Sequence, residues 1–518
     1  MKIIVSAVIT VFLSVNSFSI FAQFKQIAES PVFEDPATGY AEILQMKNGN
    51  TAYIHITPRE GIELRIYDAN HAEKAVTEVD LSIERVKTSN EMTMFPTNNR
   101  EEIEGVFEIA GDIVVFFHEF TVKKSALYRI IIDGNTAKLK EEKEIFSEQW
   151  AKYTIKKDMY SDNYAILTGE KIMHYNAEHK EINMAEFKSP DAANPTLYYR
   201  DMIVLSNDRV CLFYLASDKS DKAKNNKGNM YIVTTERVSA KISYDKLDLP
   251  ADQHYDHVMV KYDATDKKII LLTVAKTNDG TYETYLNLID PVSKKIEKIT
   301  GFGPTESLNQ AYAERYSKKT GYGGLPQNLF INADGTISVV YEEMGVQTTT
   351  ADRYSRTDTK LGKLVINTFD KKGKLISNYL VPKAHWIIFT GLGVFYHYQR
   401  EGTVQQMWRG NQYKPFQYID GPKGKFIFFN DTERNNDVTK DKFAEVQGVT
   451  DCDAFMYKLT GTDLFSKREY AFGEPEKKGH TIAMFSVSAY DKKTNTYVTL
   501  KLDDTRKKKI KIVWLQPE

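Results

Sequence analysis

The chain has 518 residues, of which 42% are apolar, 12% aromatic and 27% charged, so it can bury a large core and is not a disordered polymer. Lys and Arg total 69 against 70 for Asp and Glu, a balance that excludes the basic surface of a general nucleic-acid binder. The two cysteines, Cys211 and Cys452, are too few for a disulfide scaffold or a cysteine-built metal cluster. We expect them to stay unpaired, with Cys211 as a small buried side chain.

The first residues have the pattern of a signal peptide. Lys2 precedes an apolar run from Ile3 to Val15, and the segment closes with Phe21-Ala22 before Gln23. A positive residue, a short apolar core and a small residue at the cleavage point define such a peptide, so we assign it to residues 1–22. Its ending, Phe-Ala-Gln, resembles signal peptides of Bacteroidota. No later run approaches the roughly 20 apolar residues of a membrane-spanning helix, so we expect an exported, soluble chain in the periplasm or outside the cell.

The rest of the chain is predicted to form β-strands almost throughout. Apolar and polar residues alternate over 62–67, 281–288 and 509–514, which is typical of strands with one buried face. Continuous apolar runs at 113–117, 210–215 and 269–272 indicate strands buried on both faces. Asn48-Gly49, Ala110-Gly111 and Asp334-Gly335 separate pairs of such segments, and these residues suit tight hairpin turns. Helices are predicted only near 306–316 and 147–153.

A large apolar residue followed by Asp or Asn recurs along the chain and predicts repeated units. The pairs are Tyr67-Asp68, Ile132-Asp133, Tyr175-Asn176, Tyr244-Asp245, Ile289-Asp290, Phe369-Asp370 and Tyr490-Asp491. Each pair is expected to close a strand and begin a polar turn. The last interval is about twice as long as the others, so we expect one more unit near residues 459–463.

On this pattern the chain resembles secreted β-propeller proteins, in which four-stranded sheets repeat around a central channel. The resemblance covers nearly all of residues 39–515 and matches no named propeller family. It implies an all-β fold of seven or eight four-stranded blades in a single domain, residues 23–518, with the N-terminal strand completing the C-terminal sheet. Two β-sandwich domains are the alternative, although no Pro-, Ser- or Gly-rich linker divides the chain.

No residue pattern assigns a catalytic or metal site, and no cofactor is expected. The run His254-Tyr255-Asp256-His257 lacks a further metal ligand, so we interpret it as the polar beginning of a strand. Glu342 and Glu343 are interpreted as a solvated strand edge, although two carboxylates facing the channel would suffice for glycoside hydrolysis. The sequence contains no phosphate-binding glycine loop, nucleophile elbow or zinc-protease motif.

Two aromatic segments form the candidate ligand-binding surface. Its residues are Tyr312, Arg315, Tyr316 and Tyr322 in a glycine-ended insertion, and Trp408 and Arg409 in a later segment. If exposed, tyrosine rings and planar guanidinium groups give a large contact area at low entropic cost, and stacked rings hold sugars. The alternative is that these rings cover the sheets of the blades.

The functional prediction is an exported propeller without catalytic activity that binds a protein, peptide or glycan partner through loops on one face. The alternative is a carbohydrate-active enzyme that uses carboxylates facing the channel. A structural role in an envelope assembly is a third possibility. We expect no nucleic-acid partner and no membrane span, and the sequence leaves the oligomeric state open. The fold by itself assigns no function.

Overall fold

The computed structural model describes most of the chain from residue 24 onward. The described residues are 24–57, 61–82, 100–120, 125–205, 209–217, 228–236, 239–249, 254–276, 282–351, 354–407, 410–435, 443–459, 464, 468–475, 479–504 and 509–517. The predicted signal peptide and the candidate residues Trp408 and Arg409 lie outside them. Among the described residues, no helix is long and apolar enough to cross a membrane.

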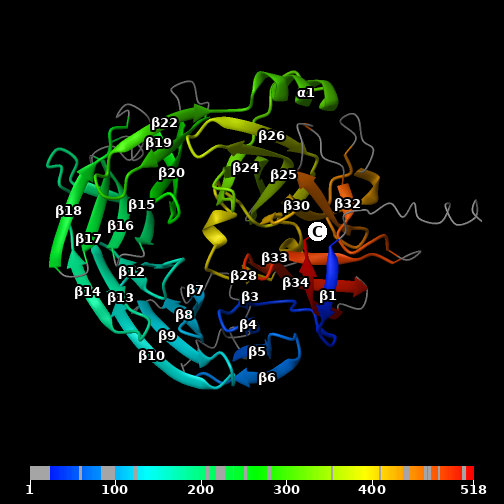
Figure 1. Cartoon of the computed structure of the whole chain (residues 1–518), viewed down its shortest axis with the longest axis horizontal. Coiled ribbons are helices and arrows are strands. Elements are labelled where there is room, and N and C mark those ends of the chain that lie inside the picture. The colour runs from blue at the N-terminus through cyan, green and yellow to red at the C-terminus, as the bar shows by residue number, and fades with distance from the viewer. Residues whose placement is uncertain are drawn as a thin grey trace, which may run out of the picture.

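Eight antiparallel sheets stand around a common centre like the blades of a propeller (Figure 1). In seven blades the four strands follow one another in chain order, and the first strands of most neighbouring blades contact each other around the channel. The predicted all-β propeller of seven or eight four-stranded blades is confirmed, with eight blades.

The first four blades occupy the N-terminal half of the chain. Blade one contains β3 (Tyr40–Gln45), β4 (Thr51–Thr57), β5 (Gly61–Tyr67) and β6 (Glu73–Val79). Blade two contains β7 (Arg100–Ile109), β8 (Asp112–Phe120), β9 (Ser125–Asp133) and β10 (Leu139–Glu148). Blade three contains β11 (Tyr153–Lys157), β12 (Tyr164–Thr168), β13 (Lys171–Tyr175) and β14 (Glu181–Glu186). Blade four contains β15 (Thr196–Leu205), β16 (Arg209–Ser217), β17 (Asn229–Glu236) and β18 (Ser239–Lys246).

The other blades follow in sequence. Blade five contains β19 (His254–Asp263), β20 (Lys268–Lys276), β21 (Tyr282–Ile289) and β22 (Ile296–Phe302). Blade six contains β23 (Leu325–Ile331), β24 (Ile337–Ala351), β25 (Tyr354–Phe369) and β26 (Leu375–Val381). Blade seven contains β29 (Gln417–Gly421), β30 (Gly424–Asp431), β31 (Asp453–Leu459) and β32 (Arg468–Tyr470). Blade eight contains β33 (Ile482–Asp491), β34 (Thr496–Asp504), β35 (Lys509–Gln516) and the N-terminal β1 (Lys25–Glu29).

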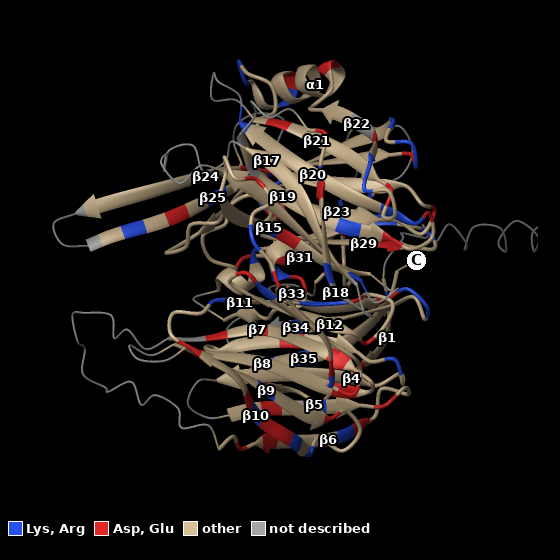
Figure 2. Cartoon of the chain, turned by 90° about the vertical axis from the view of Figure 1, so that its left-hand side faces the viewer, with Lys and Arg blue, Asp and Glu red and all other residues tan. Residues whose placement is uncertain are grey.

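Shorter elements connect or extend these blades. They are β2 (Phe33–Glu34), which pairs with β35, the helix α1 (Glu306–Tyr316), β27 (His385–Ile387), β28 (Gln405–Gln406), and the 3₁₀ turns η2 (Tyr398–Arg400), η3 (Asn411–Tyr413) and η4 (Glu433–Asn435). The paired β24 and β25 are longer than the other strands and project beyond the ring (Figure 2).

The two ends of the chain close the ring. β1 pairs with β35 in antiparallel register, and Ile512 donates its amide hydrogen to Ser30 Oγ at 2.9 Å. Trp514 of β35 is fully buried against blade one, where its ring contacts Tyr67 and its Nε1 donates to Thr51 Oγ1 at 3.0 Å. The predicted completion of the C-terminal sheet by the N-terminal strand is therefore confirmed.

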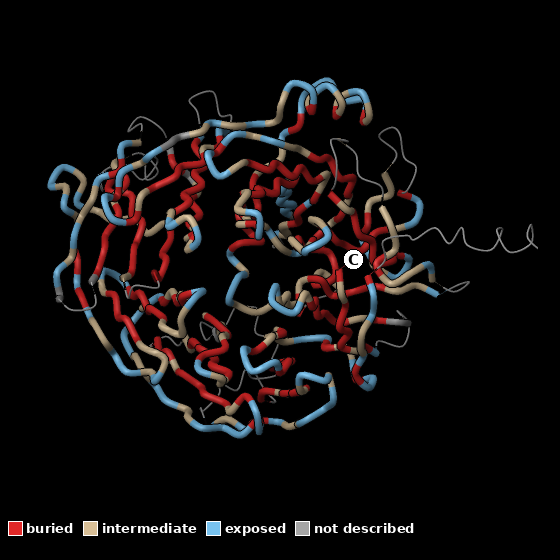
Figure 3. Tube along the Cα trace, in the orientation of Figure 1, coloured by how far each residue is buried: buried red, intermediate tan, exposed pale blue. Residues whose placement is uncertain are grey.

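The hydrophobic core is a ring of eight interfaces, because each apolar cluster joins the facing surfaces of two adjacent blades. Buried residues accordingly run through the middle of the sheets, and the outer strands and turns are exposed (Figure 3). The middle strands of a blade are covered on both faces by the two adjacent blades, which explains the continuous apolar runs in the sequence. Cys211 and Cys452 lie buried and free in different clusters.

The repeated apolar-Asp pair marks the same place in five blades. Each of these residues ends the third strand or comes directly after it, and its side chain accepts backbone amide hydrogens of the next turn; they are Asp68, Asp133, Asn176, Asp290 and Asp370. The pairs at Asp245 and Asp491 lie elsewhere, within β18 and at the end of β33. The extra unit expected near 459–463 corresponds to the third strand of blade seven, β31.

The two predicted helices have different outcomes. The prediction at 306–316 is confirmed by α1, which begins at the N-cap Thr305. The prediction at 147–153 is wrong, because that stretch contains the end of β10, a turn and the beginning of β11. β10 is the outermost strand of its blade and is mostly exposed, so it lacks the alternation that identifies a strand.

Candidate functional site

A long connection between blades six and seven crosses the centre of the ring. It comprises residues 382–416, which we call the plug, and its described parts are 382–407 and 410–416. Its strand β27 pairs with β25 of blade six, and its strand β28 pairs with β3 of blade one. Figure 1 shows this yellow segment inside the ring. The chain itself therefore occupies the channel.

Tyr398 joins the plug to blades three, four and five. The ammonium group of Lys156 lies 4.6 Å from the centre of the Tyr398 ring, and the Tyr398 hydroxyl donates to Asp201 Oδ2 at 2.7 Å. The amides of Met202 and Val260 donate to the same carboxylate, each at 2.8 Å. Burial raises the pKa of Asp201, and Lys156 opposes that rise. This carboxyl group is thus already engaged in holding the plug.

His397 joins the plug to blades six and seven as a neutral imidazole. Asn328 Nδ2 donates to its Nδ1 at 2.8 Å, so Nε2 carries the hydrogen and donates to Gln417 Oε1 at 3.2 Å. The ring also stacks on Phe416, with centroids 4.6 Å apart. Burial, assisted by the positive charge of Arg400, lowers the pKa of His397 to about 3. The histidine therefore holds the plug in its uncharged form.

We expect the stability of the protein to fall in mild acid because of His397. Its folded pKa of about 3 lies below the unfolded value of 6.5, so the unfolded chain takes up the proton first as the pH falls. The stability contributed by the neutral ring is present above pH 6.5 and is lost as the pH falls toward 3. From about pH 7 to about pH 5 the loss is about 2 kcal/mol, measurable by urea unfolding.

The matched comparison is His397→Gln, which keeps a polar side chain and removes this titration. The variant should lose less stability than the wild type over the same pH interval. Equal pH dependence in His397→Gln and the wild type would show that the loss has another source.

The plug also contacts the other blades. Arg400 donates from one guanidinium nitrogen to the Ser486 carbonyl oxygen of blade eight at 3.0 Å. The Gly402 carbonyl oxygen accepts the Val106 amide hydrogen of blade two at 2.9 Å. Together with the β28–β3 pairing, these bonds bring the plug into contact with the first strand of every blade.

Two cavities lie against Tyr398, and both are also lined by Lys156 and Glu401. The first cavity, of about 270 Å³, is lined by Phe107, Lys156, Lys157, Asp158, Met159, Tyr160, Met202, Ile203, Val204, Val260, Lys261, Tyr262, Tyr398, Glu401 and Gly402. It lies where β11 turns into β12. The second cavity, of about 280 Å³, is lined by Glu104, Tyr153, Thr154, Ile155, Lys156, Tyr199, Arg200, Asp201, Val258, Phe395, Tyr398, Gln399, Glu401 and Thr403. It lies nearer the beginnings of β11, β15 and β19, the first strands of blades three, four and five.

A third cavity, of about 240 Å³, brings together two carboxyl groups with opposite pKa shifts. Burial raises the pKa of Glu42 to about 8, against the opposing effects of the Ile43 amide and Arg400. The pKa of Glu401 is lowered even though burial opposes this, because Lys261 lies 2.8 Å away and further hydrogen bonds stabilise the carboxylate. Near pH 7, Glu42 therefore carries a proton and Glu401 does not.

The predicted aromatic site is mostly inside the protein. Tyr312, Tyr316 and Tyr322 are buried, and the ring of Tyr312 packs edge-to-face against the other two. Tyr312 donates its hydroxyl hydrogen to Glu343, so these rings hold α1 against the sheets of blades five and six. Arg315 is partly exposed. The burial of the three rings agrees with the alternative that they cover the sheets of the blades, and a ligand-binding role for these residues stays a prediction.

The interpretation of Glu342 and Glu343 as a solvated edge is also wrong. Glu342 is fully buried, its Oε1 lies 2.5 Å from Lys383 Nζ, and its Oε2 accepts the Tyr396 hydroxyl at 2.7 Å. Glu343 lies at an irregularity in the pairing of β24 with β25 and accepts from Tyr312. No sequence pattern indicated Lys383 as the partner, because the plug brings it to this strand from beyond β26.

Solved structures that are similar to this chain share little of its sequence. No protein-family model matches the sequence, and no curated protein matches it significantly. Among solved structures, the WD40 domain of SCAP from fission yeast is similar at 9% identity and a TM-score of 0.38, over 94% of this chain and 98% of that one. The Dos1 propeller is similar at 8% identity and a TM-score of 0.36, over 95% of both chains. A PL25 ulvan lyase structure is similar at 10% identity and a TM-score of 0.38, over 85% of this chain and 98% of that one.

Proposed function

We propose that the protein is an exported, non-catalytic propeller that binds an acidic segment of a protein, peptide or glycan at the first cavity. The observation that carries this proposal is a loosely held ammonium group beside exposed aromatic and apolar side chains. Among the described residues, the nearest partners of Lys156 Nζ are the Tyr398 hydroxyl oxygen at 3.5 Å and Asp201 Oδ1 at 3.8 Å. An incoming carboxylate or sulfate group gains a charge-assisted hydrogen bond there.

The rim of this cavity supplies the contact area that a ligand needs. Met159 is 72% exposed and Tyr160 is 50% exposed, and both lie in the turn that follows β11. The ring of Tyr160 meets that of Tyr262 edge-to-face, so two aromatic surfaces flank the opening. Aromatic faces of this kind support the stacking of a sugar ring or a peptide side chain. The other two lysines of this cavity are paired, Lys157 with Asp162 and Lys261 with Glu401.

The proposal is tested with two acidic probes, an oligogalacturonate and a peptide of alternating Glu and Phe. We expect the wild type to bind one of them in isothermal titration calorimetry, more weakly at higher salt because the contact is ionic. Lys156→Met should reduce the affinity by roughly tenfold or more, the loss of one charged hydrogen bond. Lys152→Met removes an exposed lysine outside the cavity and should leave the affinity unchanged. Failure of both probes to bind, or equal affinity in the two variants, would contradict the proposal.

A carbohydrate-active enzyme is the second candidate, favoured by Glu42 and Glu401 in the third cavity. A protonated carboxyl group beside an ionised one is the arrangement used for acid and base catalysis at neutral pH. The same calorimetry samples serve to separate the two functions, because turnover of the oligogalacturonate releases new reducing ends. Turnover by the wild type that disappears in Glu42→Gln would replace the binding function with the enzymatic one.

A further inference from the structure

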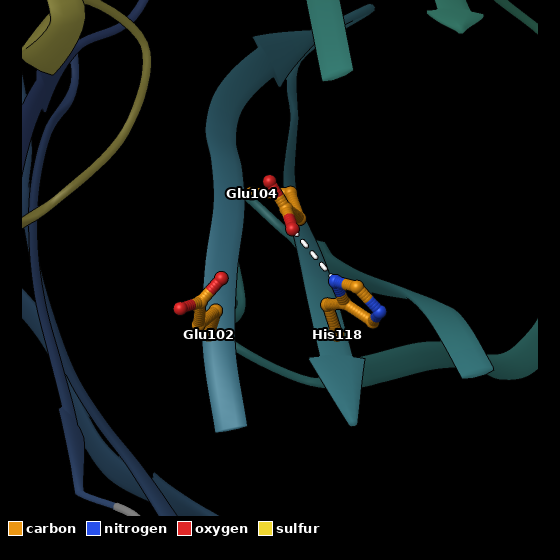
Figure 4. A group of neighbouring side chains, drawn as sticks. All are labelled: Glu102, Glu104 and His118. Carbon is orange, nitrogen blue, oxygen red and sulfur yellow. Dashed lines mark hydrogen bonds and ion pairs between the residues drawn. The ribbon is translucent and has the colours of Figure 1, made fainter. Parts of the chain in front are cut away.

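Blade two carries a cluster of three side chains that we infer to be a binding site for a first-row divalent metal ion. The cluster consists of Glu102 and Glu104 of β7 and His118 of β8 (Figure 4). One ligand atom from each of the three lies within 4.8 Å of the other two. The cluster lies outside the first and third cavities, and Glu104 alone lines the second.

The pairing of β7 with β8 places the three groups on one side of the sheet. Glu102 is directly opposite His118, and the register shifts by one residue between Ile103 and Gly105. The extra residue in this bulge is Glu104, whose Oε1 lies 2.7 Å from His118 Nδ1. Two carboxyl groups therefore flank one imidazole, as Figure 4 shows.

The hydrogen bonds behind the imidazole determine which nitrogen carries its hydrogen. His118 is fully buried, and its Nε2 lies 2.7 Å from Ser125 Oγ. The single hydroxyl hydrogen of Ser125 is donated to the Ala151 carbonyl oxygen at 2.8 Å. Nε2 must then be the donor to Ser125, so the lone pair of a neutral His118 is at Nδ1 and points toward the carboxylate of Glu104.

A lone pair facing a carboxylate at this distance requires a proton or a metal ion between the two groups. Either a proton is shared by Nδ1 and the Glu104 carboxyl group, or a metal ion takes Nδ1 and the two carboxylates as ligands. The hydroxyl behind Nε2 is the kind of partner that orients metal-bound histidines in proteins. Imidazole together with carboxylate suits first-row ions such as Zn²⁺ and Mn²⁺ better than Ca²⁺, which prefers oxygen ligands alone.

The site has a route to solvent and room for a further ligand. The Glu104 side chain is 19% exposed and lies in the wall of the second cavity. Three protein ligands leave at least one coordination position for water or a small anion. Arg200 lines the same cavity and provides a positive charge there.

The test uses the mature chain stripped with chelator and titrated with Zn²⁺ in isothermal titration calorimetry. We expect one saturable zinc ion per chain and a melting temperature that rises with zinc, because the ion binds only the folded site. Glu104→Gln and Glu102→Gln should each weaken zinc binding by roughly tenfold or more and abolish the zinc-dependent rise in melting temperature. Glu102→Gln changes a partly exposed side chain, so it keeps the test valid if Glu104→Gln does not fold.

A matched control is available in the neighbouring blade. Glu63 lies 3.5 Å from His55 Nδ1, but it also pairs with Arg65, and among the described residues no third metal-ligating side chain joins these two. Glu63→Gln should therefore bind zinc as the wild type does. A wild type that binds no zinc would show that a proton occupies the cluster, and zinc binding that survives both glutamate substitutions would place the ion elsewhere; either result overturns the inference.

Discussion

Replacing Lys383 with methionine should destabilise the protein by about 3–5 kcal/mol, because it leaves Glu342 as an unpaired charge in the core. Both side chains of this ion pair are fully buried, and the ammonium nitrogen lies 2.5 Å from the carboxylate. Burial lowers the pKa of Lys383 and raises that of Glu342, and the attraction between the two groups opposes both shifts. The loss is measured as the change in free energy of unfolding in urea.

Two further variants show whether the effect comes from burial. Lys360→Met removes a lysine that is 45% exposed and pairs with Glu445, so it should cost less than about 1 kcal/mol. The double variant Lys383→Met, Glu342→Leu removes both buried charges and should recover much of the stability, since apolar side chains replace the pair. A cost for Lys383→Met as small as that for Lys360→Met would contradict the role of the pair.

Tyr398→Ala should have the second large effect, again about 3–5 kcal/mol. The substitution removes a buried ring that the ammonium groups of Lys156 and Lys261 contact, and it deletes the hydroxyl that donates to Asp201. It also merges the first and second cavities, whose shared wall contains this ring. Urea unfolding measures the loss, and hydrogen exchange should show faster exchange of the amides in residues 395–407.

The control for this variant is Tyr282→Ala, at a tyrosine of β21 that is 42% exposed. Its cost should stay below about 1 kcal/mol, because little buried surface is lost. If Tyr398→Ala leaves both the stability and the exchange of residues 395–407 unchanged, the plug is held by other contacts and Tyr398 is not its anchor.

Much of the fold was accessible from the sequence because its signals are local. Turn residues such as Asp68 and Asp370 bond to amides two and four residues ahead, so a short stretch of sequence contains the whole interaction. The hairpin at Ala110-Gly111 was likewise predicted from its own residues. Repetition of these signals then implied the ring, which no single blade indicates.

The plug was not predicted because its interactions connect distant parts of the chain. Tyr398 and Asp201 are 197 residues apart, and no periodicity in the sequence of 382–416 indicates that this segment enters a channel. The interval from Phe369 to Tyr490 was long for two reasons, a hidden blade and this insertion, and the sequence pattern revealed only the first.

The sequence left open whether the tyrosines near α1 are exposed or cover the sheets, and their spacing favours the second possibility. Leu308, Tyr312 and Tyr316 are spaced four residues apart, so on a helix they form one face, and that face is buried. The Glu102, Glu104 and His118 cluster was harder to predict. Unbroken pairing from the Ala110-Gly111 turn would set Ile103 opposite His118, and only the bulge at Glu104 restores Glu102 to that position.

The closure of the ring makes folding wait for the whole chain. β1 must remain without its partner while about 480 further residues are made, since Ser30 meets Ile512 across a separation of 482 positions. Contacts of such separation form late, because closing a long loop has an entropic cost that earlier contacts must first offset. A product that stops before β35 would keep most of its blades yet expose the unpaired edge of β1 and the apolar surface that Trp514 covers. The pairing of β1 with β35 therefore distinguishes a finished molecule from a truncated one. In a truncated chain the unpaired strand edge is exposed, so proteases can attack it there.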